Sequence, residues 1–178
     1  MPAVRLEVAG EQHRHALLAA VTRSLQLHGR WVHAPRDEHE FDVWLTRLEL
    51  GRSRAFIVID PVEACPAGVT TMSEITRGTL ESAYLSYYAL QPYAGRGYLY
   101  EGVRQTIRYA FGSLRLHRLE ANIQPANQPS KALVQRLGFR LEGYSPRYLK
   151  INGRWRDHER WAVLREEFKA GALPDAPP

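Results

Sequence analysis

Two glycines flank an arginine in the segment QPYAGRGYL (91–99). The segment follows a strand-like run, AYLSYYAL (83–90), and leads into a helix-like run over 98–114. Glycine has no Cβ and lets a ligand approach the backbone closely. The first turn of a helix offers free N–H groups and the positive end of its dipole. The segment therefore predicts an anion site built from backbone amides, with Arg96 as an added charge; an ordinary strand-to-helix turn is the alternative.

Other reactive patterns are scarce in the chain. Cys65 is the lone cysteine of 178 residues, so neither an internal disulfide nor a cysteine zinc site is expected. No group of His, Cys and acidic residues has metal-ligand spacing, so we expect no metal. The Walker pattern and the third glycine of the dinucleotide fingerprint are both missing. The net charge of +5 favours an anionic partner without naming one.

Apolar periodicity predicts the elements that position this turn. Helices are expected over 11–25, 37–50, 98–114 and 130–137. Strands are expected over 4–8, 54–60, 67–76, 81–90 and 117–124, and then in a hairpin of 139–151 and 154–164. This order predicts an α/β fold, with a mixed, mostly antiparallel twisted sheet of about seven strands flanked by about four helices. Residues 1–168 are expected to form one domain and 169–178 a flexible tail.

A second motif follows the strand–helix–strand crossover, NQPSKALVQRLGFRLEGY (127–144). Together with the glycine turn, its N-x-x-S…LGF-x-x-EG pattern resembles the GNAT superfamily of acetyl-CoA-dependent N-acetyltransferases. The ending YLKINGRWRDHERWAVL (148–164) is similar to the Rim-type branch, which acetylates N-terminal alanines of ribosomal proteins. The resemblance implies the GNAT fold, acetyl-CoA as the acetyl donor, and direct attack of an amine on the thioester in a ternary complex.

The resemblance also implies where acetyl-CoA lies. Strand 83–90 should splay from its neighbour, so that backbone groups near Ala89, Leu90 and Gln91 pair with the pantetheine arm. The pyrophosphate should lie on the turn amides of Gly95, Arg96, Gly97, Tyr98 and Leu99. Ala94 and Leu99 depart from the family pattern, and Leu99 is expected to be bulky beside the phosphates.

Three residues of the second motif receive roles from the same resemblance. Asn127 should contact the pantetheine arm or a nearby water, and Ser130 should protonate the leaving thiolate. Both residues could instead cap the helix over 130–137. Lys131 could reach the phosphates, although a solvated helix lysine is the simpler interpretation.

The base that takes the proton of the amine stays open. One Rim-type relative uses a glutamate where this sequence has Leu149 or a neighbour, so that role does not carry over. Our hypothesis is Glu74 or Glu81, because Glu81 begins the strand that lines the site and Glu74 lies on the adjoining strand. The alternatives are Glu120, the Asp157-His158 pair and a water relay to a distant carboxylate.

The acceptor is expected between the first two helices, where Trp31 and His33 line the groove or anchor the loop by packing. The leading hypothesis is acetylation of a protein N-terminus, with ribosome association. The alternatives are a small-amine acetyltransferase and a non-catalytic RNA- or ribosome-binding factor. No apolar run approaches membrane-spanning length and no signal peptide is recognisable, which favours the cytoplasm. Homodimers are common in the superfamily, but the sequence specifies no interface.

Overall fold

The computed structural model describes residues 1–29 and 31–168. Its strands form one seven-stranded sheet in the order β1-β2-β3-β4-β5-β7-β6. The strands are β1 (Arg5–Val8), β2 (Arg54–Asp60), β3 (Cys65–Thr76), β4 (Ser82–Ala89), β5 (Arg118–Ile123), β6 (Arg140–Ile151) and β7 (Arg154–Leu164). The helices are the 3-10 helix η1 (Glu11–His13), α1 (Arg14–Arg23), α2 (Leu25–His28), α3 (Glu38–Glu49), α4 (Tyr98–Phe111) and α5 (Gln128–Arg136). The predicted tail 169–178 lies outside the described residues.

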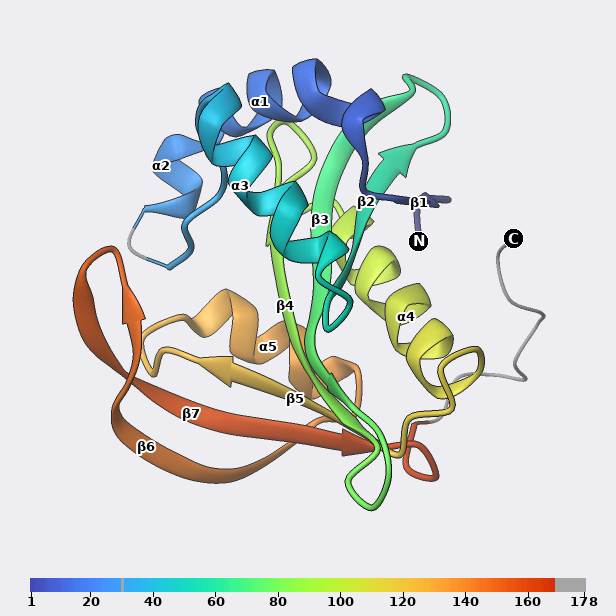
Figure 1. Cartoon of the computed structure of the whole chain (residues 1–178), viewed down its shortest axis with the longest axis vertical. Coiled ribbons are helices and arrows are strands. Elements are labelled where there is room, and N and C mark those ends of the chain that lie inside the picture. The colour runs from blue at the N-terminus through green and yellow to red at the C-terminus, as the bar shows by residue number, and fades with distance from the viewer. Residues whose placement is uncertain (30, 169–178) are drawn as a thin grey trace.

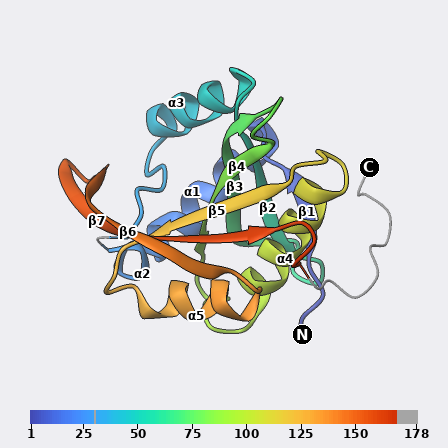
Figure 2. The ribbon, with the colours of Figure 1, turned by 90° about the horizontal axis from the view of Figure 1, so that it is seen from below.

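The sheet is the middle of three layers (Figure 1). Figure 2 shows α3 on one side of the sheet and α4 and α5 on the other. Successive strand residues point to opposite faces. Leu85 of β4 therefore belongs to the core formed with α4 and α5, whereas Val69 of β3 belongs to the core formed with α1 and α3. The two faces of β4 thus look into two separate halves of the protein.

The helix that follows the glycine turn is held tightly against the sheet. Val103 and Ile107 of α4 are fully buried, as the helical periodicity predicts. Gly102 allows the close approach, because a Cβ at this position would lie 2.4 Å from Cγ2 of Val58 on β2. This packing fixes the first turn of α4 relative to the end of β4.

The predicted fold class is confirmed, with a mixed and mostly antiparallel sheet in the expected element order. The helix predicted over 11–25 is wrong in detail, because it is divided into η1, α1 and α2, and the helix count rises accordingly. The break before α2 falls at Ser24, whose buried hydroxyl donates to the Ala20 carbonyl at 2.7 Å and accepts the Gln91 N–H at 2.9 Å. The partner of Ser24 is distant in sequence, so local periodicity could not reveal it.

Candidate active site

β4 and β5 are parallel neighbours that pair at one end only. Their register joins Ser82 to Arg118 and Tyr84 to Glu120, and the pairing stops there although both strands continue. β4 runs on to Ala89 and β5 to Ile123 without further pairing. The result is a wedge-shaped opening in the middle of the sheet, which we call the splay; its apex is at Tyr84.

The free edge of β4 can be assigned from its hydrogen bonds. The Glu81 carbonyl accepts two N–H groups from the segment entering β5, at 2.7 and 3.2 Å, and the Leu90 N–H donates toward β3 at 3.0 Å. Because the backbone groups of a strand alternate in direction with a period of two, odd-numbered residues face β5 and even-numbered residues face β3. Beyond the last pair, Tyr84 with Glu120, which uses the Leu85 N–H, the Leu85 carbonyl and the backbone groups of Tyr87 and Ala89 therefore point toward the splay.

This assignment changes the expectation for the pantetheine contacts. The N–H groups of Leu90 and Gln91 are taken by β3 and by the Ser24 hydroxyl. The Ala89 carbonyl accepts a hydrogen bond of 2.9 Å from Nε2 of His28. Of the three predicted positions, Ala89 alone keeps its N–H directed at the splay, and the other free groups belong to Leu85 and Tyr87.

His28 has a defined protonation state. Burial lowers the pKa of its imidazole, and its Nε2–H is committed to the Ala89 carbonyl. The ring also packs edge-on against Tyr88, with centroids 5.0 Å apart. A neutral histidine thus fastens α2 to the end of β4, at the wide end of the splay.

The turn between β4 and α4 has the geometry of an anion cradle. Gly95 and Gly97 have φ values of 78° and 87°, a region that glycine adopts without strain. Gly97 is the N-cap of α4 and has no side chain to bind the N–H groups of the first turn. A Cβ on Gly95 would meet nothing within 4 Å, so the space beside it is open. Arg96 is exposed at the same place.

The neighbouring predicted contacts of the turn differ in kind. Tyr98 packs edge-on against Tyr93, with ring centroids 4.9 Å apart. The Leu99 side chain lies against Gly68 of β3, because its Cδ1 is 3.0 Å from the place of a Cβ there. The bulk of Leu99 is therefore directed at the sheet, in contrast to the expectation that it crowds the phosphates. Both residues can still offer their backbone N–H groups at the start of α4.

The first turn of α5 faces the splay from the side of α4. Asn127 is the N-cap of α5, and its side chain accepts the Ser130 N–H at 3.3 Å, so the capping alternative for Asn127 is correct. The Ser130 hydroxyl has a different partner, the hydroxyl of Tyr87 at 2.7 Å. Tyr87 is partly buried, and desolvation raises the pKa of its phenol. The pair is therefore two neutral hydroxyls that join β4 to α5.

Lys131 differs from both interpretations made from the sequence. Its Nζ lies 3.0 Å from Oε1 of Glu159 on β7 and 3.2 Å from the Pro125 carbonyl oxygen. The lysine is mostly buried, with 19% of its side chain exposed. It therefore ties α5 to the sheet and is neither solvated nor directed at the turn.

The two glutamates proposed as base lie at different places. Glu74 sits in a bulge of β3 beside the apex, where Ser73 is registered with Tyr84. Its side chain is 63% exposed and 3.9 Å from Arg52. Glu81 is exposed and precedes β4, on the paired side of the apex. Both glutamates are therefore on the paired side, but Glu74 is nearer the apex and its charge acts on Tyr84, which favours Glu74 over Glu81.

The predicted acceptor residues lie in the loop between α2 and α3, on the side of the sheet opposite α4 and α5. Trp31 is half-buried and His33 is exposed in the loop between α2 and α3. His33 contacts the tip of the β6–β7 hairpin through Asn152 Oδ1 at 3.2 Å, and it contacts Glu40 of α3 at 3.3 Å. The loop and the hairpin therefore meet over this face, as Figure 1 shows for the ends of β6 and β7 near α2.

Two tyrosines gain a role that the sequence did not reveal. Tyr87 of β4 is hydrogen-bonded to Ser130 of α5, and Tyr148 of β6 meets a residue of β4. The hydroxyl of Tyr148 lies 3.3 Å from that of Tyr84 at the apex. Alternation along β4 could have placed Tyr84 and Tyr87 on opposite faces, but no local signal brings β6 to β4.

Within residues 1–29 and 31–168, no group of three or more His, Cys, Asp or Glu side chains could hold a metal ion. Cys65 is exposed at the start of β3 and is not in a disulfide. None of the helices in the described part of the chain is long and apolar enough to cross a membrane.

A splayed sheet beside a glycine turn offers one ligand both a free strand edge and an anion cradle. Residues 4–140 match the family described as "Acetyltransferase (GNAT) domain". The chain therefore belongs to the GNAT acetyltransferases. It is an enzyme that takes its acetyl group from acetyl-CoA.

Individual relatives sharpen this assignment. The chain is 37% identical over 135 residues to the ribosomal protein uS5-alanine N-acetyltransferase of Escherichia coli (strain K12), which covers 72% of this chain and 70% of the relative. The structure of Mycobacterium smegmatis RimJ in complex with CoA-disulfide superimposes with a TM-score of 0.86 at 25% identity, covering 95% of this chain and 85% of the other. A spermidine N-acetyltransferase from Vibrio cholerae, in complex with CoA and spermine, has a TM-score of 0.78 at 20% identity, covering 92% and 96%.

Proposed function

We propose that this acetyltransferase transfers the acetyl group to the N-terminal α-amine of a protein, with a ribosomal protein as the physiological acceptor. The identity of 37% over most of the chain to a uS5-alanine N-acetyltransferase carries this proposal. Such an acceptor implies action in the cytoplasm, in association with ribosomes or newly made ribosomal proteins. The alternative of a non-catalytic RNA-binding factor loses its support, since the chain belongs to an enzyme family.

On the donor side, the free edge of β4 and the glycine turn are suited to acetyl-CoA. The Leu85 carbonyl, both backbone groups of Tyr87 and the Ala89 N–H would pair with the pantetheine arm. The amides of Gly95, Gly97, Tyr98 and Leu99 would hold the pyrophosphate, because a helix N-terminus stabilises negative charge. The Arg96 N–H instead donates to the Tyr93 carbonyl at 3.2 Å, so Arg96 would contribute through its guanidinium. An N–H on this edge of β4 would also donate to the thioester carbonyl and stabilise the oxyanion that develops there.

The reaction balances with groups on the two faces of the splay. The neutral amine attacks the thioester carbon, a C–N bond forms and the C–S bond breaks. The Ser130 hydroxyl would give its proton to the departing thiolate while Tyr87, 2.7 Å away, passes one on to Ser130. Tyr87 would regain a proton from solvent, so that both hydroxyls end neutral. The amine would lose its proton to Glu74, directly or through water, since this exposed carboxylate lies beside the apex.

A small polyamine is the second candidate acceptor. The carboxylates of Glu74 and Glu120 both contribute to the raised pKa of Tyr84, and because Glu120 is paired with Arg118, the exposed Glu74 is the main source of negative charge at the apex. Negative potential favours a cationic acceptor of either kind, a basic peptide or a polyamine. The fold shared with spermidine N-acetyltransferase keeps this alternative open.

A thiol-release assay would separate the two candidates. The acceptors would be a peptide with a free N-terminal alanine, the same peptide with an acetylated N-terminus and an internal lysine, and spermidine. We expect turnover of the free peptide and none of its blocked form. Turnover of spermidine alone would contradict the proposed acceptor and leave the acetyl-CoA chemistry intact.

A further inference from the structure

The β6 strand contains a bulge whose only opposing residue on β7 is Asp157. Ser145 is registered with His158 and Leu149 with Arg156, so residues 146–148 lie opposite Asp157 alone. Extra residues on one strand bend it and redirect its side chains. Bulges are frequent beside active sites for this reason.

Asp157 holds the bulge at two points. Its Oδ1 accepts the backbone N–H of Arg147 at 2.7 Å, and its Oδ2 accepts the hydroxyl of Tyr144. Arg147 has a φ of 47°, a left-handed conformation that costs free energy for a residue with a side chain. The two hydrogen bonds also keep the pKa of Asp157 low, so the carboxylate stays charged and remains a strong acceptor.

The residue after Arg147 is Tyr148, and the bulge gives its side chain an unusual reach. Two strands, β5 and β7, separate β6 from β4, which corresponds to about 14 Å in a flat sheet. The Tyr148 hydroxyl nevertheless lies 3.3 Å from the Tyr84 hydroxyl, and its ring packs edge-on against His158. The meeting point is the apex of the splay, on the face opposite α4 and α5, because the adjacent Ala83 and Leu85 belong to the other core.

We infer, on the basis of the proposed function, that the Tyr84 and Tyr148 hydroxyls bind the acceptor amine, and that Asp157 is a positioning residue that places Tyr148 through the bulge. A phenol oxygen can accept an N–H of a neutral amine and leave the nitrogen lone pair directed at the thioester carbon. The acceptor-binding site would then be assembled from strands at the centre and the edge of the sheet.

The electrostatic surroundings suit this role. The hydrogen bond to Tyr148, desolvation, and the nearby Glu120 and Glu74 raise the pKa of Tyr84 to about 12. Burial lowers the pKa of His158, which faces Tyr148. The phenol is therefore un-ionised near neutral pH and binds an amine by hydrogen bonding, while the carboxylates around it attract the amine's cationic form.

The test compares Asp157→Ala, Asp157→Asn, Tyr148→Phe and Tyr144→Phe in the full-length enzyme. The assay uses the alanine peptide or, if the thiol-release assay shows turnover of spermidine alone, spermidine. The inference can therefore be tested even if the proposed acceptor is wrong. We expect Asp157→Ala and Tyr148→Phe each to raise the acceptor KM about tenfold, as for the loss of one hydrogen bond. Asp157→Asn keeps an acceptor for the Arg147 N–H, and Tyr144→Phe keeps the Arg147 bond, so both should stay within about twofold.

Acetyl-CoA affinity should be unchanged in all four variants, since the donor lies on the other face. The Asp157→Ala, Tyr148→Phe double variant should be no worse than either single variant, because both changes act through one hydroxyl. Unchanged acceptor KM in Tyr148→Phe, or additive effects in the double variant, would overturn the inference. If Asp157→Ala fails to fold, the contrast between Tyr148→Phe and Tyr144→Phe decides the question.

Discussion

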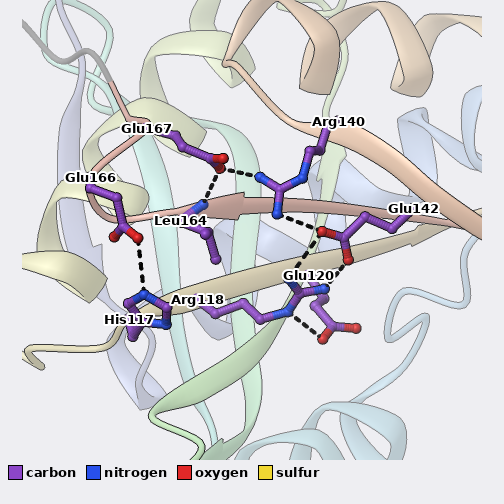
Figure 3. Close-up of polar contacts among 8 residues, drawn as sticks. All are labelled: His117, Arg118, Glu120, Arg140, Glu142, Leu164, Glu166 and Glu167. Carbon is purple, nitrogen blue, oxygen red and sulfur yellow. Dashed lines mark hydrogen bonds and ion pairs between the residues drawn. The ribbon is translucent and has the colours of Figure 1, made fainter.

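At the closed end of the β4–β5 pair, charged side chains form a continuous network, whereas the open end joins its elements through neutral hydroxyls. Figure 3 shows the closed end, where Arg118 contacts Glu120 and Glu142, and Arg140 contacts Glu142 and Glu167. At the open end, the corresponding contacts are the Tyr87–Ser130 and Tyr84–Tyr148 hydroxyl pairs.

The two ends of the β4–β5 pair therefore differ in role: the closed end stabilises the fold, and the open end holds groups that are free to act on a substrate. A carboxylate bound to arginine holds a proton weakly, and the Arg118 guanidinium keeps the pKa of Glu142 low. Such groups stabilise the fold but make poor bases. The open end leaves strand edges and hydroxyls free to act on a substrate, and the exposed Glu74 lies next to its apex. Four predictions test this division, from the largest expected effect to the smallest.

Glu74→Gln should lower kcat about 100-fold, because a general base contributes about that much or more to a proton transfer. Its matched control is Glu81→Gln, which changes an exposed glutamate farther from the apex. The measurement is the steady-state rate against pH for both variants. An equal loss of rate in the two variants, or no loss in either, would contradict the assignment of Glu74 as the base.

Gly95→Asp should weaken acetyl-CoA binding roughly 30-fold, equivalent to about 2 kcal/mol, because it places a negative charge where the pyrophosphate is expected. Gly78→Asp is the matched control. Gly78 has a φ of 76° and open space around it, as Gly95 does, but it lies in the turn between β3 and β4. Isothermal titration should find the control within about twofold of the parent. Equal losses would reveal backbone strain as the cause.

Ser130→Ala and Tyr87→Phe should each lower kcat about tenfold and leave acetyl-CoA affinity unchanged, since each removes one hydroxyl of the proton path. The double variant should match the single variants, because the two hydroxyls act in series. Single-turnover rates provide the measurement. A full rate in Ser130→Ala would assign the thiolate proton to another donor.

Glu142→Gln should lower the free energy of unfolding by about 1 kcal/mol at neutral pH and leave kcat unchanged. The Arg118 contact lowers the folded-state pKa of Glu142 below its ordinary 4.5, so this stability is present above that pH and is lost as the pH falls through the folded-state pKa. Urea titrations at several pH values should show the difference between variant and parent shrinking in acid. Glu49→Gln, at an exposed position of α3, is the control.

Much of the fold could be predicted from local patterns. The bounds of β2 and β7 agree with the predicted runs 54–60 and 154–164, because buried strands with clear turn signals carry a strong periodic pattern. The glycine turn was also recognisable, since φ values of 78° and 87° suit glycine. The break at Ser24 was missed, because its cause is a hydrogen bond to Gln91.

The sequence by itself determined the family, the order of the strands and the position of the glycine turn, all of which depend on residues near one another in the chain. The tertiary structure alone decided which backbone groups of β4 are free, that Ser130 meets Tyr87, and that Tyr148 reaches Tyr84. Those contacts join residues 43 and 64 positions apart. They depend on where two strands stop pairing and where a third one bulges, which are properties of the packed sheet and not of any single segment.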